Sequence, residues 1–125
     1  MSRDQQRLPD YLVHIIEAIE RIDRYTEDMG ELAFLGNQMA QDAVIRNFEI
    51  IGEASHNIET HYSEFAAAHP ELPLAFAYQM RNAVAHGYFK VDLEIVWKTI
   101  HSELPRLHAQ VQEALADLPR NNDNE

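Results

Sequence analysis

The sequence predicts an all-α domain, an up-and-down bundle of four main helices, or five if the last is divided. Apolar residues recur at helical spacing in four stretches, and no stretch alternates apolar and polar residues as a strand does. Prolines and glycines separate these stretches by short connections, which favour antiparallel packing. We expect residues 1–119 to form a single helical domain and the polar residues 120–125 to form a disordered tail.

The first predicted helix runs from about Leu8 to Met29. Its apolar residues recur every three or four positions, so one face of the helix can enter the core. These residues are Leu12, Ile15, Ile16, Ile19 and Ile22. Pro9 suits a first-turn position, where its missing amide hydrogen is not needed, and Gly30 follows the last periodic residues.

The second predicted helix is the longest. It begins after Asn37, whose side chain can cap the first amides, and it ends at the turn residues 69–70 and 72–73. Its apolar stripe consists of Val44, Phe48, Ile51, Ile58 and Tyr62.

Two further helical stretches complete the predicted bundle. The third covers residues 73–85, and Gly87 stands where a left-handed C-terminal cap is expected. The final helix begins after Asp92, a good cap, and runs to about residue 118. Pro105 lies inside this last helix, so it should kink the helix or split it in two.

The composition restricts the classes of function. The 125 residues include 21 acidic and 10 basic side chains, a net charge of −11. A general polyanion binder is disfavoured, because nucleic acid binding rests mainly on Lys and Arg. The absence of cysteine excludes a disulfide framework, a thiolate metal site and a cysteine nucleophile. We find no apolar signal segment and no membrane-spanning run, so we expect a cytoplasmic protein that does not contact a membrane.

The densest set of reactive side chains is Arg81-Asn82-Ala83-Val84-Ala85-His86-Gly87-Tyr88. On a regular helix Arg81 and His86 would lie about 140° apart, so the chain must leave the helix between them to bring both to one site. Gly87 permits that exit, because a left-handed residue there lets His86 turn back towards the last helical turn. The negative end of the helix then favours the protonated imidazole.

These residue types suit cleavage of RNA without a metal ion. Attack of a ribose 2′-hydroxyl on its own phosphate needs a base, an acid and a cation beside the phosphorane. His86 can act as base or acid, Arg81 can hold the phosphate, and Asn82 can orient the attacking hydroxyl or the scissile phosphate. Because one chain supplies a single such imidazole, a two-fold homodimer would supply the second.

The motif resembles that of a known family. Arg81-Asn82 with His86 is similar to the Arg-polar-x3-His motif of the HEPN superfamily, and Tyr88 extends it to the Arg-x4-His-x-Tyr form of HepT-type ribonuclease toxins. Further segments resemble that family in the same order: residues 47–54, Leu72-Pro73 with Met80, and residues 91–97 with Leu104-Pro105. The lead-in differs at Leu74, where the family often has Trp.

The resemblance implies an all-α HEPN-type bundle that dimerises with the motif at the interface. It implies a metal-independent endoribonuclease, without a cofactor of its own, that acts on RNA such as tRNA or mRNA as the toxin of a type VII-like toxin-antitoxin pair. The antitoxin would be a minimal nucleotidyltransferase that uses ATP to transfer AMP to Tyr88. The added phosphate would lie beside Arg81 and His86 and would repel RNA.

The sequence leaves two other functions open. Glu53-x-x-His56, with Glu49 one turn earlier, has the spacing of a carboxylate-bridged di-metal bundle, although no second Glu-x-x-His occurs. We expect Glu49 and Glu53 to be solvated or structural, and one of them to pair with Arg46 or Arg81 across helices. The residues that we expect to support the site are Glu53, Arg46 and Gly87. In the other alternative, the bundle is a non-catalytic adaptor that binds a nucleotide or a protein, and the motif only caps a helix.

Overall fold

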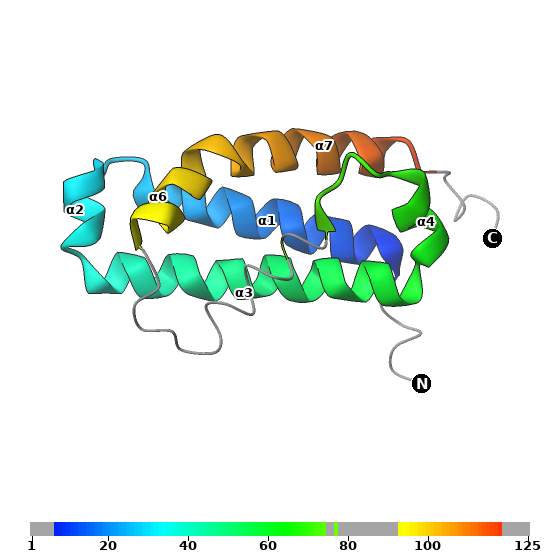
Figure 1. The fold of residues 1–125 in the computed structure, drawn as a ribbon, viewed down its shortest axis with the longest axis horizontal. Helices are drawn as coiled ribbons and strands as arrows, with labels where there is room; N and C mark the ends of the chain where they lie inside the picture. Colours follow the sequence, from blue (N-terminus) through cyan, green and yellow to red (C-terminus); the bar gives the residue numbers. More distant parts are fainter. Residues whose placement is uncertain (1–6, 75–76, 78–92, 119–125) are drawn as a thin grey trace.

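The computed structural model describes residues 7–74, 77 and 93–118, and it confirms the all-α fold (Figure 1). This part of the chain contains six helices and no strand. The helices are α1 (Leu8–Thr26), α2 (Glu31–Leu35), α3 (Gln38–His61), α4 (Ser63–Ala68), α6 (Leu93–Ser102) and α7 (Leu104–Ala116). Helices α1, α3 and α7 run along the long direction of the molecule, with α2 and α6 at one end and α4 at the other.

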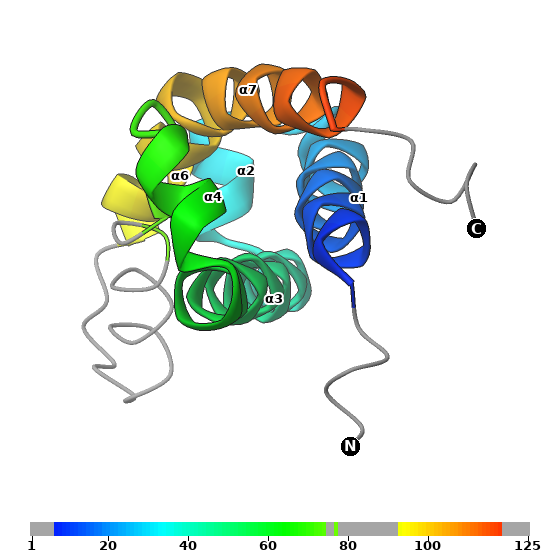
Figure 2. The same ribbon diagram turned by 90° about the vertical axis from the view of Figure 1, so that its right-hand side faces the viewer.

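Helix α1 lies between α3 and α7 and contacts both of them, so α3 and α7 occupy opposite sides of the bundle (Figure 2). The apolar periodicity explains this arrangement, because each long helix turns one apolar stripe towards the others. The largest apolar side chains that are fully buried are Leu12, Ile15, Ile22, Phe34, Val44, Ile58, Val96 and Val111. None of the helices described combines the length and apolar composition that crossing a membrane requires.

Two predicted helix boundaries are confirmed by their local chemistry. Asn37 caps α3, since its side-chain oxygen accepts a hydrogen bond from the amide of Ala40 at 3.0 Å. Pro105 splits the last predicted helix into α6 and α7 and occupies the first turn of α7. A proline fits there because the first amides of a helix have no partner within it.

The helix count and two boundaries differ from the prediction. Helix α1 ends at Thr26, and α2 forms where the sequence predicts no helix. Two contacts hold this short helix: Phe34 is fully buried, and the Gln41 side chain donates hydrogen bonds to the carbonyls of Phe34 and Leu35, each at 3.0 Å. Local periodicity does not reveal such tertiary contacts.

The second difference concerns the predicted long helix, which ends at His61 and is followed by the separate helix α4. The backbone leaves the helical conformation at Tyr62, whose ring packs edge-on against Tyr11 of α1 with centroids 6.3 Å apart. Packing on α1 therefore places the turn earlier than the prolines predict. Most of the third predicted helix, residues 73–85, and the tail, residues 120–125, lie outside the described residues.

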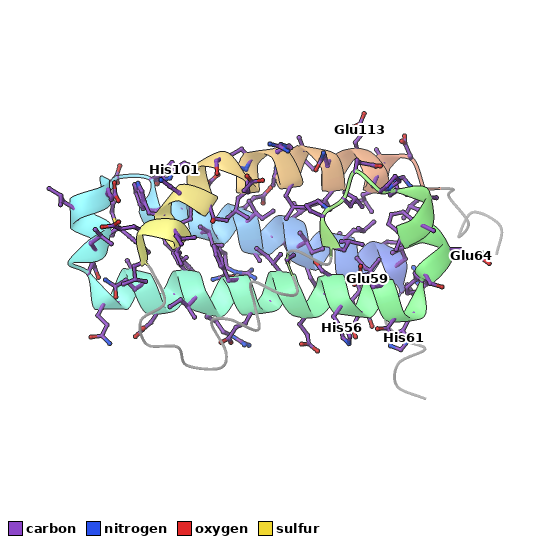
Figure 3. All side chains as sticks on the ribbon, viewed as in Figure 1. His56, Glu59, His61, Glu64, His101 and Glu113 are labelled. Atoms are coloured by element: carbon purple, nitrogen blue, oxygen red, sulfur yellow. The ribbon has the colours of Figure 1, made fainter. Side chains whose placement is uncertain are left out.

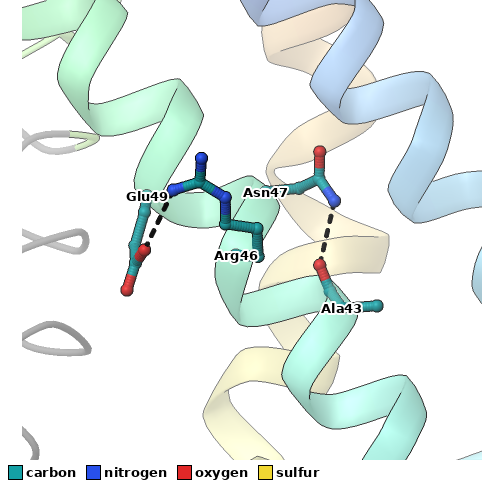
Figure 4. Close-up of polar contacts among 4 residues, drawn as sticks. All are labelled: Ala43, Arg46, Asn47 and Glu49. Carbon is teal, nitrogen blue, oxygen red and sulfur yellow. Dashed lines mark hydrogen bonds and ion pairs between the residues drawn. The ribbon is translucent and has the colours of Figure 1, made fainter.

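A buried polar contact fixes α1 against α3. The Asn47 side chain is only 4% exposed, and its oxygen accepts a hydrogen bond from Nε of Arg21 at 2.8 Å. Its Nδ2 donates to the carbonyl oxygen of Ala43 at 2.9 Å (Figure 4). The amide thus finds both a donor and an acceptor, as a buried polar group requires.

Candidate functional site

The described residues flank the predicted motif without including it. Before the motif, Leu72, Leu74 and Ala77 are buried in the core; after it, Leu93 opens α6. The motif residues Arg81, Asn82, His86, Gly87 and Tyr88 lie outside the residues that the structure describes. Their convergence on one phosphate therefore stays a prediction.

The chain is anchored in the core just before the motif. Pro73 and Ala77 line a small apolar hollow together with Phe48 and Ile51 of α3. Thr99, Leu104 and Leu107, from α6 and α7, also contribute to the lining. Apolar contacts with α3, α6 and α7 thus determine where the polypeptide enters the motif segment.

Two side-chain contacts of His69 hold the turn that precedes Leu72. The His69 ring lies 4.3 Å from the Phe65 ring, centroid to centroid, and its Nδ1 lies 2.9 Å from Oε2 of Glu71. The hydrogen bond from His69 is the main cause that lowers the pKa of Glu71 below its ordinary value. The turn is therefore held by a charge-assisted contact as well as by packing.

Arg46 and Glu53, the supporting residues that the structure describes, both lie on the exposed side of α3. The Arg46 side chain is 70% exposed, and its Nη1 lies 3.5 Å from Oε1 of Glu49 (Figure 4). The prediction that Glu49 or Glu53 pairs with Arg46 is confirmed for Glu49, and this pair lies within α3, since residues three positions apart face each other on one helix. Pairing with Arg81 across helices stays a prediction, because Arg81 lies outside the described residues.

The structure brings Arg46 and Glu53 to one open hollow between α3 and the N-terminal half of α1. The hollow is lined by Tyr11, His14, Arg46, Glu49, Ile50, Glu53, Ala54 and Asn57. His14, which the sequence does not single out, is exposed there. Helical spacing places 46, 50, 53 and 57 on one stripe of α3. His14 lies beside that stripe because of the way α1 packs on α3, and no pattern in the sequence predicts this packing.

No three His, Asp or Glu side chains within residues 7–74, 77 and 93–118 are placed to hold a metal ion. Figure 3 shows His56, Glu59, His61 and Glu64 spread around the end of α3 and the start of α4. His101 and Glu113 lie on α6 and α7, away from these residues. These six labelled groups are thus dispersed over the surface.

A family model described as "HepT-like: Ribonuclease HepT-like" matches residues 15–114. The match covers most of the chain and includes the α3 residues that line the hollow and the motif at residues 81–88. The chain belongs to the HepT-like ribonuclease family. The resemblance seen in the motif is therefore confirmed over nearly the whole domain.

Individual relatives agree with membership of the HepT-like family. The chain is 42% identical over 103 residues to "Probable ribonuclease HepT" of Thermococcus cleftensis, a match that covers 82% of this chain and 91% of that protein. It is 37% identical over 114 residues to "Gamma-glutamylcyclotransferase and putative RNase MJ0434" of Methanocaldococcus jannaschii. That match covers 91% of this chain and 50% of the longer protein. No solved structure gives a significant match.

Proposed function

We propose that this HepT-like protein is a metal-independent endoribonuclease and the toxin of a type VII-like toxin-antitoxin pair. The observation that carries the proposal is the family match over residues 15–114, which includes the Arg81-to-Tyr88 motif. Relatives at 42% and 37% identity bear names that describe ribonucleases. The motif supplies the cation, the imidazole and the amide that RNA cleavage needs.

The proposed reaction is an internal transesterification of RNA. The ribose 2′-oxygen attacks the adjacent phosphorus, so a bond from phosphorus to O2′ forms as the bond to O5′ breaks. A base removes the 2′-hydroxyl proton and an acid protonates the departing 5′-oxygen. The products are a 2′,3′-cyclic phosphate and a 5′-hydroxyl. No metal ion is required, because protein groups supply both proton transfers and the positive charge.

A homodimer provides the two imidazoles that this reaction uses. His86 acts as the base, and His86 of the partner subunit acts as the acid. The two copies of Arg81 stabilise the negative charge on the phosphorane, and Asn82 orients the attacking hydroxyl or the scissile phosphate. Dimerisation also gathers scarce positive charge in one cleft, which matters for a chain whose net charge is −11.

The proposed regulation is covalent. A minimal nucleotidyltransferase antitoxin transfers AMP to Tyr88: the phenolic oxygen attacks the α-phosphorus of ATP and pyrophosphate leaves. The new phosphodiester places a bulky negative group two residues from His86. It competes with the RNA phosphate for Arg81 and repels the substrate, so modification switches the ribonuclease off.

The test of this function is RNA cleavage in EDTA by the wild type and by His86→Ala. Loss of a proton-transfer group costs typically about 10²–10⁴-fold in rate, so we expect His86→Ala to lose at least about 100-fold. The control is His101→Ala, which removes an exposed histidine on α6 and should leave the rate unchanged. Circular dichroism checks that both variants fold.

Three results would contradict the proposal. Cleavage abolished by EDTA would indicate a metal centre, as the di-metal alternative requires. Equal activity of the wild type and His86→Ala would remove the imidazole from the mechanism. RNA or nucleotide binding without any cleavage would favour the adaptor alternative, in which the motif only caps a helix.

A further inference from the structure

We infer that two copies of this chain meet along the exposed side of α3, with Arg46 of each copy opposite Glu53 of the other. The inference rests on the proposed function, which requires a homodimer, and it specifies where the two copies touch. It is carried by the distribution of charge along α3. Both residues lie within the described part of the chain and both are exposed.

No described helix covers the side of α3 that faces away from the core. In the end-on view α3 lies at the margin of the bundle, with α1 beside it and α7 across from it (Figure 2). The core side of α3 carries Val44, Phe48, Ile51, Ser55 and Ile58.

The opposite side of α3 forms an outward stripe. Successive residues of a helix are rotated by about 100° around its axis, and we assign to the stripe the residues that lie within about 60° of the direction opposite to the core. Its charged members are Asp42, Arg46, Glu49 and Glu53, and Ile50 and Asn57 lie among them. The stripe is complementary to itself about a two-fold axis, because two antiparallel copies of one helix face each other reciprocally and each contact occurs twice.

One position of the two-fold axis pairs the charges of the outward stripe. When the axis passes midway between Glu49 and Ile50, Arg46 faces the partner's Glu53, and Glu53 faces the partner's Arg46. The two ion pairs then lie about 10 Å apart along the helix, on either side of the axis.

The same register sets Asp42 opposite the partner's Asn57. Glu49 and Ile50 lie next to the two-fold axis, so each of them faces its own copy in the partner subunit. The contact between the two Glu49 carboxylates is the like-charge contact of this register, and it opposes the two attractions between Arg46 and Glu53.

Neighbouring registers lose this complementarity. Sliding the partner by about one turn in one direction places Arg46 opposite Glu49, but it also places Asp42 opposite Glu53. Sliding it by one turn the other way leaves Arg46 opposite Asn57, without an ion pair. Sliding by two turns sets either Arg46 or Glu53 opposite itself. The charges thus select one register among those that α3 can adopt.

Burial and local contacts are compatible with this interface. Arg46 is 70% exposed, and its bond to Glu49 is long, at 3.5 Å, so exchanging it for an intermolecular contact costs little. An ionised Glu53 has about four lone-pair sites, so it can accept a bond from the partner beside its contacts within the chain. Half-buried Ile50 lies next to the axis, so the two copies of Ile50 add an apolar contact beside the charged ones.

The experiment is a charge-reversal exchange followed by sedimentation velocity. Arg46→Glu and Glu53→Arg each convert two attractions into two repulsions, so we expect each to raise the dimer Kd at least about tenfold. The double variant Arg46→Glu/Glu53→Arg restores both pairs and should return within about threefold of the wild type. An equimolar mixture of the two single variants should form a heterodimer, because positions 46 and 53 of one variant then carry charges opposite to those at positions 53 and 46 of the other.

The chain offers a matched control on the opposite side of the bundle. Arg106 and Glu113 are exposed on α7 and have the same residue types and the same seven-residue spacing. Glu113 points away from the core in Figure 3. Arg106→Glu and Glu113→Arg should leave the dimer Kd unchanged. Because α7 has 13 residues and α3 has 24, α3 presents the longer contact surface.

The possible outcomes separate this inference from the proposed function. If the wild type is a dimer and neither Arg46→Glu nor Glu53→Arg changes its Kd, the inference is overturned, but the proposal of a composite active site is unaffected. If only Arg106→Glu and Glu113→Arg raise the dimer Kd, the interface lies on α7 and the inference is overturned. A dimer disrupted by Arg46→Glu that still cleaves RNA at the wild-type rate would support the α3 interface and contradict the composite site. A mixture that recovers the heterodimer also shows that both variants fold.

Discussion

Replacement of Asn47 by alanine tests whether the contact between α1 and α3 depends on one buried amide. The variant removes the hydrogen bond from Arg21 at 2.8 Å and the bond to the Ala43 carbonyl at 2.9 Å. A hydrogen bond to a charged group contributes about 1.5–3 kcal/mol and a neutral one about 0.5–1.5 kcal/mol. Alanine regains about 0.5 kcal/mol through its higher helix propensity. We therefore expect Asn47→Ala to lower the free energy of unfolding by about 1.5–4 kcal/mol.

Urea denaturation at one fixed protein concentration measures this change, since the stability of a dimer depends on concentration. The control is Gln112→Ala, which removes an exposed amide from α7 and should change the free energy by less than about 0.5 kcal/mol. In a double-mutant cycle with Arg21→Ala, the two losses should be clearly less than additive. A loss below about 0.5 kcal/mol for Asn47→Ala, or full additivity with Arg21→Ala, would refute the reasoning.

Two further predictions concern the turn before the motif and the motif itself. His69→Ala should raise the pKa of Glu71 towards its ordinary value, as measured by a carboxyl NMR titration, because the imidazole bond is the main cause of its lowering. Because the pKa of Glu71 is lower in the folded state, its contact with His69 stabilises the fold at pH values above the ordinary carboxyl pKa. This stabilisation is lost as the pH falls through the folded-state pKa. A Glu71 titration that is the same in His69→Ala and in the wild type would contradict this. Tyr88→Phe should prevent the gain of AMP units that intact mass shows after incubation with ATP and the cognate nucleotidyltransferase, whereas Tyr78→Phe should not. AMP addition to Tyr88→Phe would place the modification on another residue.

Sequence periodicity predicts the long helices because each has to bury one stripe. The stripe of α1, the cap at Asn37 and the break at Pro105 are local features, and the structure confirms each. Helices α2 and α4 are not predicted because contacts outside the apolar periodicity determine their limits. Gln41 caps α2 from the following helix, and Tyr62 ends α3 by packing on Tyr11.

The same distinction applies to the candidate site. The spacing of Arg46 and Glu53 places both on one side of α3, which the sequence alone indicates. The proximity of His14 to that side depends on how α1 packs on α3. The register of this packing is fixed by contacts between residues far apart in sequence, such as Arg21 with Asn47. A single sequence does not report these pairings.

The most direct test of the composite site is a subunit-mixing titration in EDTA. Wild-type protein is held at constant concentration, increasing amounts of His86→Ala are added, and RNA cleavage is measured after the subunits have exchanged. If both imidazoles of a dimer are required, mixed dimers are inactive, and the rate falls in proportion to the fraction of wild-type chains. A rate that stays constant as His86→Ala is added would show that each subunit cleaves RNA with its own histidine, and it would contradict the account.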